Sequence, residues 1–130
     1  MSLNDPLANV LSFINNYERL GKKEVLTNNN SKLIRQVLSV MQDEGLIGSY
    51  EEIEDGRGNM LKIHLIGSLN NCGVIKPRHT VKVEDLEKFE KSYLPAMDFG
   101  ALIISTNKGI MSNKEAKNQN LGGTLISFAY

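Results

Sequence analysis

Residues 99–116 read Phe99-Gly100-Ala101-Leu102-Ile103-Ile104, then Ser105-Thr106-Asn107-Lys108-Gly109-Ile110-Met111-Ser112-Asn113-Lys114-Glu115-Ala116. The unbroken apolar run predicts a buried strand or a short buried helix. A polar loop is expected next, and the capping-box spacing of Ser112 and Glu115 predicts a short helix that starts at Ser112. Gly122-Gly123 should end this helix, and residues 124–130 predict a terminal strand. The stretch therefore places a polar loop on a rigid, buried support.

The chain before this stretch alternates between helix and strand signals. Asp5-Pro6 predicts a helix start and Gly21 a helix end. A short strand at 25–27, a helix capped by Ser31, and a hairpin with strands at 46–53 and 60–66 follow. Two helices on one side of a small sheet suit this order. The apolar residues expected in its core are Leu7, Val10, Leu11, Ile14, Leu33, Ile34, Val37, Leu38, Met41, Leu61, Ile63 and Leu65.

Residues 67–98 contain fewer helix signals. Gly67 to Gly73 predicts a linker, and residues 74–75 and 80–83 are strand-like. Residues 84–93 could form a short helix that ends before Pro95. We expect Ile110 and Met111 to anchor the polar loop to the core.

Composition restricts the classes of protein that need consideration. The chain has 130 residues and is 41% hydrophobic, which suits one domain or two small ones that share an interface. No apolar run approaches the roughly 18 residues needed to span a bilayer, and no signal peptide is evident. The lone cysteine excludes an internal disulfide framework and a cysteine-based zinc site. A soluble intracellular protein is expected.

The net charge is zero, which by itself argues against nucleic-acid binding. The charges are unevenly distributed, however. Seven basic and nine acidic residues lie in 1–68, against eight and six in 69–130. From Ser105 onward, the sequence has one acidic residue, Glu115, and three basic ones, Lys108, Lys114 and Lys117. A locally basic tip on a neutral protein is therefore expected.

Catalytic and metal-binding patterns are weak. His64 and His79 lack the partner spacing of a metal or general-base site. Ser105 has no nucleophile elbow around it, and Cys72 has no clear basic cluster, so packing is the favoured role for Cys72. We predict no catalytic residue, metal or cofactor. A small hydrolase that uses Ser105 or Cys72, and a protein-interaction module, stay open as alternatives.

The polar loop is the most suggestive feature of the chain. The hydroxyls of Ser105 and Thr106 can bind a phosphate, a ribose or a base edge. Asn107 can pair with a base, Lys108 can neutralise a phosphate, and Gly109 lets the backbone turn close to a ligand. Residue types alone favour an ordinary polar turn over a binding site.

Several spaced motifs resemble one family, the eighth protein of the small ribosomal subunit. They run from Asp5-Pro6-Leu7-Ala8 to the terminal aromatic residue, which is the whole chain. The stretch at residues 69–78 looks like the archaeal and eukaryotic branch of the family. The other motifs are Tyr93-Leu94-Pro95-Ala96, Asp98-Phe99-Gly100, Ser105 to Ser112 with Glu115-Ala116, and Leu121-Gly122-Gly123.

The resemblance implies an α+β fold in two domains. Residues 1–67 would form an N-terminal α/β domain with two helices on a small sheet. Residues 68–130 would form a mainly antiparallel β C-terminal domain with a short helix. The implied protein is a structural constituent of the cytoplasmic ribosome, without enzymatic activity.

The implied partner is the central domain of 16S-type rRNA, gripped at an irregular helix in a way that helps subunit assembly. Neighbouring small-subunit proteins, and in some members the protein's own mRNA, are further implied partners. Binding would fall to Ser105 and Thr106, with Asn107, Lys108 and Gly109 beside them. Gly122 and Gly123 would lie close by, and Lys32 would add a backbone contact. The neutral Asn118-Gln119-Asn120, where the family is usually more basic, predicts a shallow dependence of affinity on salt.

Overall fold

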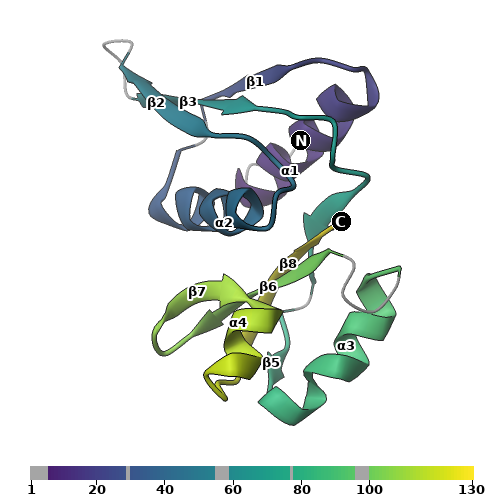
Figure 1. Ribbon diagram of the computed structural model, residues 1–130. Coiled ribbons are helices and arrows are strands. Elements are labelled where there is room, and N and C mark those ends of the chain that lie inside the picture. Colours follow the sequence, from purple (N-terminus) through teal and green to yellow (C-terminus); the bar gives the residue numbers. More distant parts are fainter. Residues whose placement is uncertain (1–5, 29, 55–58, 77, 96–99) are drawn as a thin grey trace.

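The computed structural model describes residues 6–28, 30–54, 59–76, 78–95 and 100–130. Two antiparallel sheets form the framework, one from each half of the chain (Figure 1). Of the described residues, 38% lie in helices and 32% in strands, so the predicted α+β class is confirmed. So is the predicted order of an α/β unit followed by a mainly antiparallel β unit.

The N-terminal half packs two helices against a three-stranded sheet. The helices are α1 (Pro6–Arg19) and α2 (Lys32–Asp43), and the strands β1 (Glu24–Thr27), β2 (Tyr50–Glu54) and β3 (Asn59–His64) lie in the order β1-β3-β2. Ser31 caps α2 as predicted, since its side chain accepts a hydrogen bond from the Ile34 amide at 3.2 Å. The predicted core residues are buried, except Leu33, which is partly buried against them.

One predicted strand in this half starts too early. Residues 46–49 precede β2, and Leu46 takes part in the turn that closes α2. The Leu46 amide donates to the Met41 carbonyl at 3.0 Å, and Gly45 has a φ of 76°. This is the Schellman pattern, which uses the apolar residue after the glycine to close the helix. The turn predicted between the two hairpin strands, residues 55–58, lies outside the described residues.

The C-terminal half is built around two central strands, β6 (Ala101–Thr106) and β8 (Gly123–Ala129). The sheet order is β4-β8-β6-β7, with β5 also paired to β8. Helix α3 (Leu86–Tyr93) follows a 3-10 turn at Val83–Asp85, and α4 (Asn113–Asn118) follows β7. The remaining strands are β4 (Cys72–Val74), β5 (Thr80–Val81) and β7 (Gly109–Ser112).

The predicted linker at residues 67–73 is firmly attached to the end of the chain. The amides of Asn70 and Asn71 both donate to the Tyr130 carbonyl, at 2.6 and 2.9 Å, and Leu69 is buried. Strand β4 begins at Cys72, inside the predicted linker. The two halves also share apolar packing, because Leu69, Cys72 and Ile103 belong to the same core cluster as α1 and α2. The domain boundary at residue 67 stays a prediction.

Candidate nucleic-acid interface

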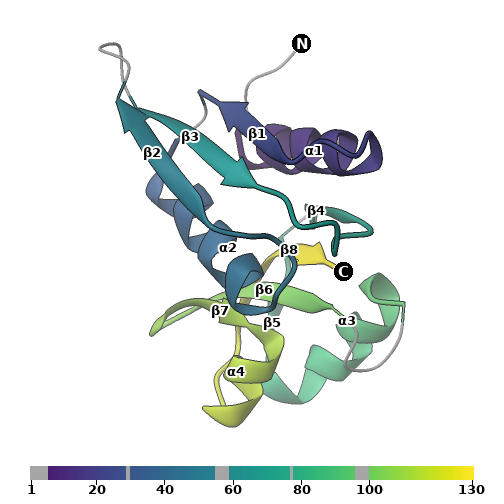
Figure 2. The same ribbon diagram turned by 45° about the horizontal axis from the view of Figure 1, so that its top comes forward.

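The residues predicted to form a polar loop form a β-hairpin instead. Ser105 and Thr106 end β6, Asn107 and Lys108 form the turn, and Gly109 begins β7. Ser105 pairs with Ile110 and Thr106 with Gly109, so the prediction of a polar loop between the strand and the helix was wrong. The closed end of the hairpin projects away from the body of the protein in both ribbon views (Figure 2). The predicted helix is present, and Ser112 caps it by accepting from the Glu115 amide at 3.3 Å.

The hydroxyl of Thr106 shapes the turn. It donates to the Gly109 carbonyl at 2.8 Å and accepts from the Lys108 amide at 3.2 Å. Gly109 has a φ of +118°, which L side chains rarely adopt, while a Cβ there would meet no atom within 4 Å. The tip is therefore held by local hydrogen bonds, and the hydroxyl hydrogen of Thr106 is already engaged.

The side chains of the hairpin alternate between the two faces of the C-terminal sheet. Ile103 and Ile110 pack on the core of the N-terminal half, whereas Leu102, Ile104 and Met111 pack in the second core cluster. Because alternate strand residues share a face, Ser105 lies on the face of Ile103, toward the N-terminal half. The predicted anchoring role of Ile110 and Met111 is confirmed.

The glycine pair is close to the hairpin for a steric reason. A Cβ on Gly123 would lie 2.1 Å from the Ser105 carbonyl oxygen, and one on Gly122 would lie 2.6 Å from the Val81 carbonyl oxygen. Only glycine permits these backbone approaches. The structure thus places Gly123 beside Ser105, and Gly122 against the end of β5.

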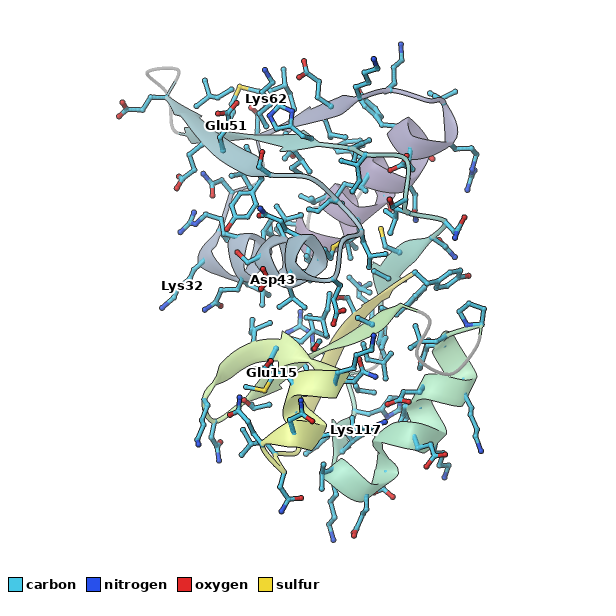
Figure 3. The ribbon with its side chains drawn as sticks, viewed as in Figure 1. Lys32, Asp43, Glu51, Lys62, Glu115 and Lys117 are labelled. Carbon is cyan, nitrogen blue, oxygen red and sulfur yellow. The ribbon has the colours of Figure 1, made fainter. Side chains whose placement is uncertain are left out.

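Lys32, the remaining predicted site residue, lies in the other half of the chain. It is the first residue of α2, is exposed, and points outward on the side to which the hairpin projects (Figure 3). Helix α2 contacts β7 and β6. Lys32 and Ser105 are therefore on the same side of the C-terminal sheet, but Lys32 is not part of the hairpin tip.

The expected basic tip is weaker than the sequence suggests. Lys114 pairs with Glu44 at 3.8 Å, and Lys117 forms a close ion pair with Glu90. Within the described part of the chain, Lys108 has no carboxylate partner, and it is exposed at the turn. Among the residues that the structure describes, Lys108 is therefore the one of the three lysines expected to make the tip basic that is not paired with a carboxylate.

Cys72 is a packed thiol. It is 2% exposed, and its sulfur lies 3.4 Å from the Asn15 side-chain oxygen and 3.5 Å from the Leu11 carbonyl oxygen. Burial, and secondarily the Glu18 carboxylate, raise the pKa of Cys72 to about 12. A thiol with so high a pKa carries little of the nucleophilic thiolate near neutral pH.

The histidines do not complete a catalytic arrangement with Ser105. His64 faces Glu51 at 3.6 Å on the first sheet, and His79 packs against the Phe89 ring. Among the residues with described positions, no hydrogen bond joins Ser105 to a histidine or a carboxylate. The same residues contain no group of three His, Cys, Asp or Glu side chains that could hold a metal ion. Geometry therefore gives no support to the hydrolase alternative.

The model of the family Ribosomal protein S8 matches residues 5–130. Since the match covers nearly the whole chain, the chain belongs to this family, as its motifs predicted. It is therefore a small-subunit ribosomal protein with its place on the ribosome in the cytoplasm, and its family is structural in role. Separately, no helix within the described ranges is long and apolar enough to cross a membrane.

Proposed function

We propose that the chain binds the central domain of small-subunit rRNA through the tip of the β6–β7 hairpin and thereby helps subunit assembly. The target is an irregular RNA helix, because a regular A-form major groove is too narrow for side chains to enter. Family membership supports the class of partner. The observation that carries the site is the projecting hairpin, which combines exposed polar residues with a buried, apolar base.

Each tip residue has a distinct role in this proposal. Ser105 supplies a hydroxyl to a ribose or base edge, and exposed Asn107 supplies an amide that can both donate and accept. Lys108 neutralises a phosphate. Thr106 and Gly109 hold the turn, and Thr106 also keeps a lone pair that can accept from the RNA.

The glycines and Lys32 have secondary roles. Gly122 and Gly123 allow the backbone of β8 to approach β5 and β6 closely enough for the RNA to pack across the sheet end. Lys32 adds a phosphate contact from α2. Neighbouring ribosomal proteins and the protein's own mRNA are further proposed partners, and the mRNA would have to present the same irregular helix.

The test is a filter-binding titration with a central-domain rRNA fragment. Ser105→Ala combined with Thr106→Ala should weaken binding by on the order of 1–3 kcal/mol, the range for one or two good polar contacts. Ser49→Ala combined with Ser68→Ala, at two exposed serines away from the hairpin, is the matched control and should bind like the wild type. Wild-type affinity in the hairpin variant, with its fold intact by circular dichroism, would remove the hairpin from the site.

A further inference from the structure

A buried acid links α3 to the base of the hairpin. Glu90 on α3 is only 8% exposed, and its Oε1 accepts a hydrogen bond from the Asn113 side-chain amide at 2.8 Å. Asn113 is 3% exposed and is the first residue of α4, immediately after β7. Its Oδ1 in turn accepts from the Leu102 amide of β6 at 3.1 Å. Three elements thus meet at one side chain.

This chain of hydrogen bonds continues the β6–β7 ladder. Backbone pairing of the two strands ends at Ile103 and Ser112, where the chain turns into α4. The side chain of Asn113 provides the acceptor that another strand residue would have given to the Leu102 amide. The open end of the hairpin is therefore closed by a side chain.

Glu90 determines which way the Asn113 amide faces. An ionised carboxylate can only accept hydrogen bonds, so the NH₂ of Asn113 must face it. The carbonyl oxygen of Asn113 is then directed to the Leu102 amide. Without an acceptor at position 90, a buried amide group would lose its partner, which is costly in a dry environment.

Glu90 also holds a lysine away from the tip. Lys117 forms an ion pair with the same Oε1 atom, and Figure 3 shows Lys117 on the side of α4 that faces α3. The hairpin projects on the opposite side of α4. Lys117 therefore balances the buried charge of Glu90 and is not directed at an RNA on the hairpin.

We propose that Glu90 is a positioning residue for RNA binding: through Asn113 it sets the angle at which the β6–β7 hairpin leaves the sheet. The inference rests on the proposed function, since it concerns the same hairpin tip. Glu90 touches no RNA. It acts through the Asn113 amide, so its effect depends on the direction of the hydrogen bond between the two side chains.

A reversal of that hydrogen bond tests the proposal. Asn113→Asp places two carboxylates together and should weaken binding to the rRNA fragment about tenfold, the loss expected for one misplaced polar contact. Adding Glu90→Gln places an amide at position 90 that can donate to the carboxylate at position 113, which reverses the direction of the wild-type hydrogen bond. The double variant should return the affinity to within about twofold of the wild type.

The dependence of rRNA affinity on salt distinguishes a positioning role of Glu90 from an electrostatic one. The slope of log affinity against log salt should be the same in Asn113→Asp as in the wild type, because no phosphate contact is removed and Glu90 still pairs with Lys117. Titrations are made at a temperature where circular dichroism shows each variant fully folded. A role in stability alone would lower the melting temperature and leave the affinity of the folded protein unchanged.

The outcomes are distinct from those of the proposed function. Wild-type affinity in folded N113D, or no recovery in the double variant, overturns the positioning role. If N113D does not fold, Asn113→Ala is the second variant, since it leaves Glu90 paired with Lys117. It should show the same tenfold loss, and wild-type affinity there also overturns the inference. Failure of the proposed function would appear instead as wild-type binding by the Ser105/Thr106 variant.

Discussion

Gly123→Ala should displace the hairpin without changing any side chain on it. The new Cβ would lie 2.1 Å from the Ser105 carbonyl oxygen and 2.9 Å from its carbonyl carbon. Ordinary carbon–oxygen contacts are about 3.3 Å or longer, so β6 and β8 must separate by roughly 1 Å. Both clashing atoms are backbone, so rotation of a side chain cannot relieve the contact. The displacement acts on Ser105 at the start of the proposed RNA contact.

Gly123→Ala should lower both the free energy of unfolding and the affinity for rRNA, and the two effects can be measured separately. Overpacking of this kind costs about 1–3 kcal/mol, which for a protein of this size lowers the melting temperature by roughly 3–10 °C. Displacement of Ser105 should in addition weaken rRNA binding by about tenfold, as for one lost polar contact. Thermal unfolding by circular dichroism measures the first effect, and RNA titration well below the melting temperature measures the second.

Gly21→Ala is the control. Gly21 has a φ of +76° and open space around its Cβ position, so alanine there costs about 1–2 kcal/mol of backbone strain without a clash. It lies after α1, in the N-terminal half. Gly21→Ala should therefore lower stability and leave RNA affinity unchanged. If Gly123→Ala is folded and binds like the wild type, the close approach of β8 to Ser105 is irrelevant to binding.

Two further predictions concern charge and protonation. Lys108→Met should reduce the slope of log affinity against log salt by roughly 0.7–0.9, the value for one phosphate contact. Lys117→Met should not change this slope, because Lys117 is paired with Glu90. Equal slopes for the two variants in salt-dependent titrations would contradict the phosphate contact assigned to Lys108. The native Cys72 thiol should not react with a thiol reagent at pH 8 until the protein unfolds. Its raised pKa contributes stability that is fully present below pH 9.0 and is lost as the pH rises toward about 12. Cys72→Ala should therefore lose less stability than the wild type across that range in denaturant titrations, and an equal loss would contradict the burial of the thiol.

Local signals in the sequence were sufficient to predict that the helices form, but the predicted end of the last one was wrong: α4 ends at Asn118, Asn120 has a φ of 56°, and Gly123 already belongs to β8. Ser31 and Ser112 act as caps where the spacing predicted them, and Gly21, with a φ of 76°, follows the end of α1 as predicted. Each of these signals depends on residues within one turn of each other, so no knowledge of distant contacts is needed. The class of the fold followed from the order of these elements.

Strand β7 was not predicted because it is too short to show a pattern. It has four residues, one of them glycine, and only Ile110 and Met111 are apolar. Alternation needs a longer run before it can be distinguished from a loop. The hydroxyls of Ser105 and Thr106 likewise suggested a loop, although both residues are paired in the sheet.

The electrostatics of the tip depended on contacts that are distant in sequence. Lys114 and Lys117 counted as free charges until the structure placed them beside Glu44 and Glu90. Helical spacing places Glu90 on the buried face of α3 with Leu86, whereas Glu87 is exposed, but the local sequence does not show that Lys117 is its partner. The partners of a lysine are determined by tertiary packing, so its charge in the sequence is only an upper limit on what it offers a phosphate.

A neutral protein can bind RNA tightly if little of the binding energy is electrostatic. In the proposed complex, Lys108 alone at the tip would give a small counterion-release term, so the affinity would come mainly from hydrogen bonds and shape. Hydrogen bonds require donors and acceptors held at fixed angles, which a flexible loop would supply only at a large entropic cost. The hairpin provides this rigidity at both ends, through the Thr106 hydroxyl at the turn and Asn113 at the base. Variants that alter this geometry should therefore change affinity more than salt slope, whereas loss of Lys108 should change the slope.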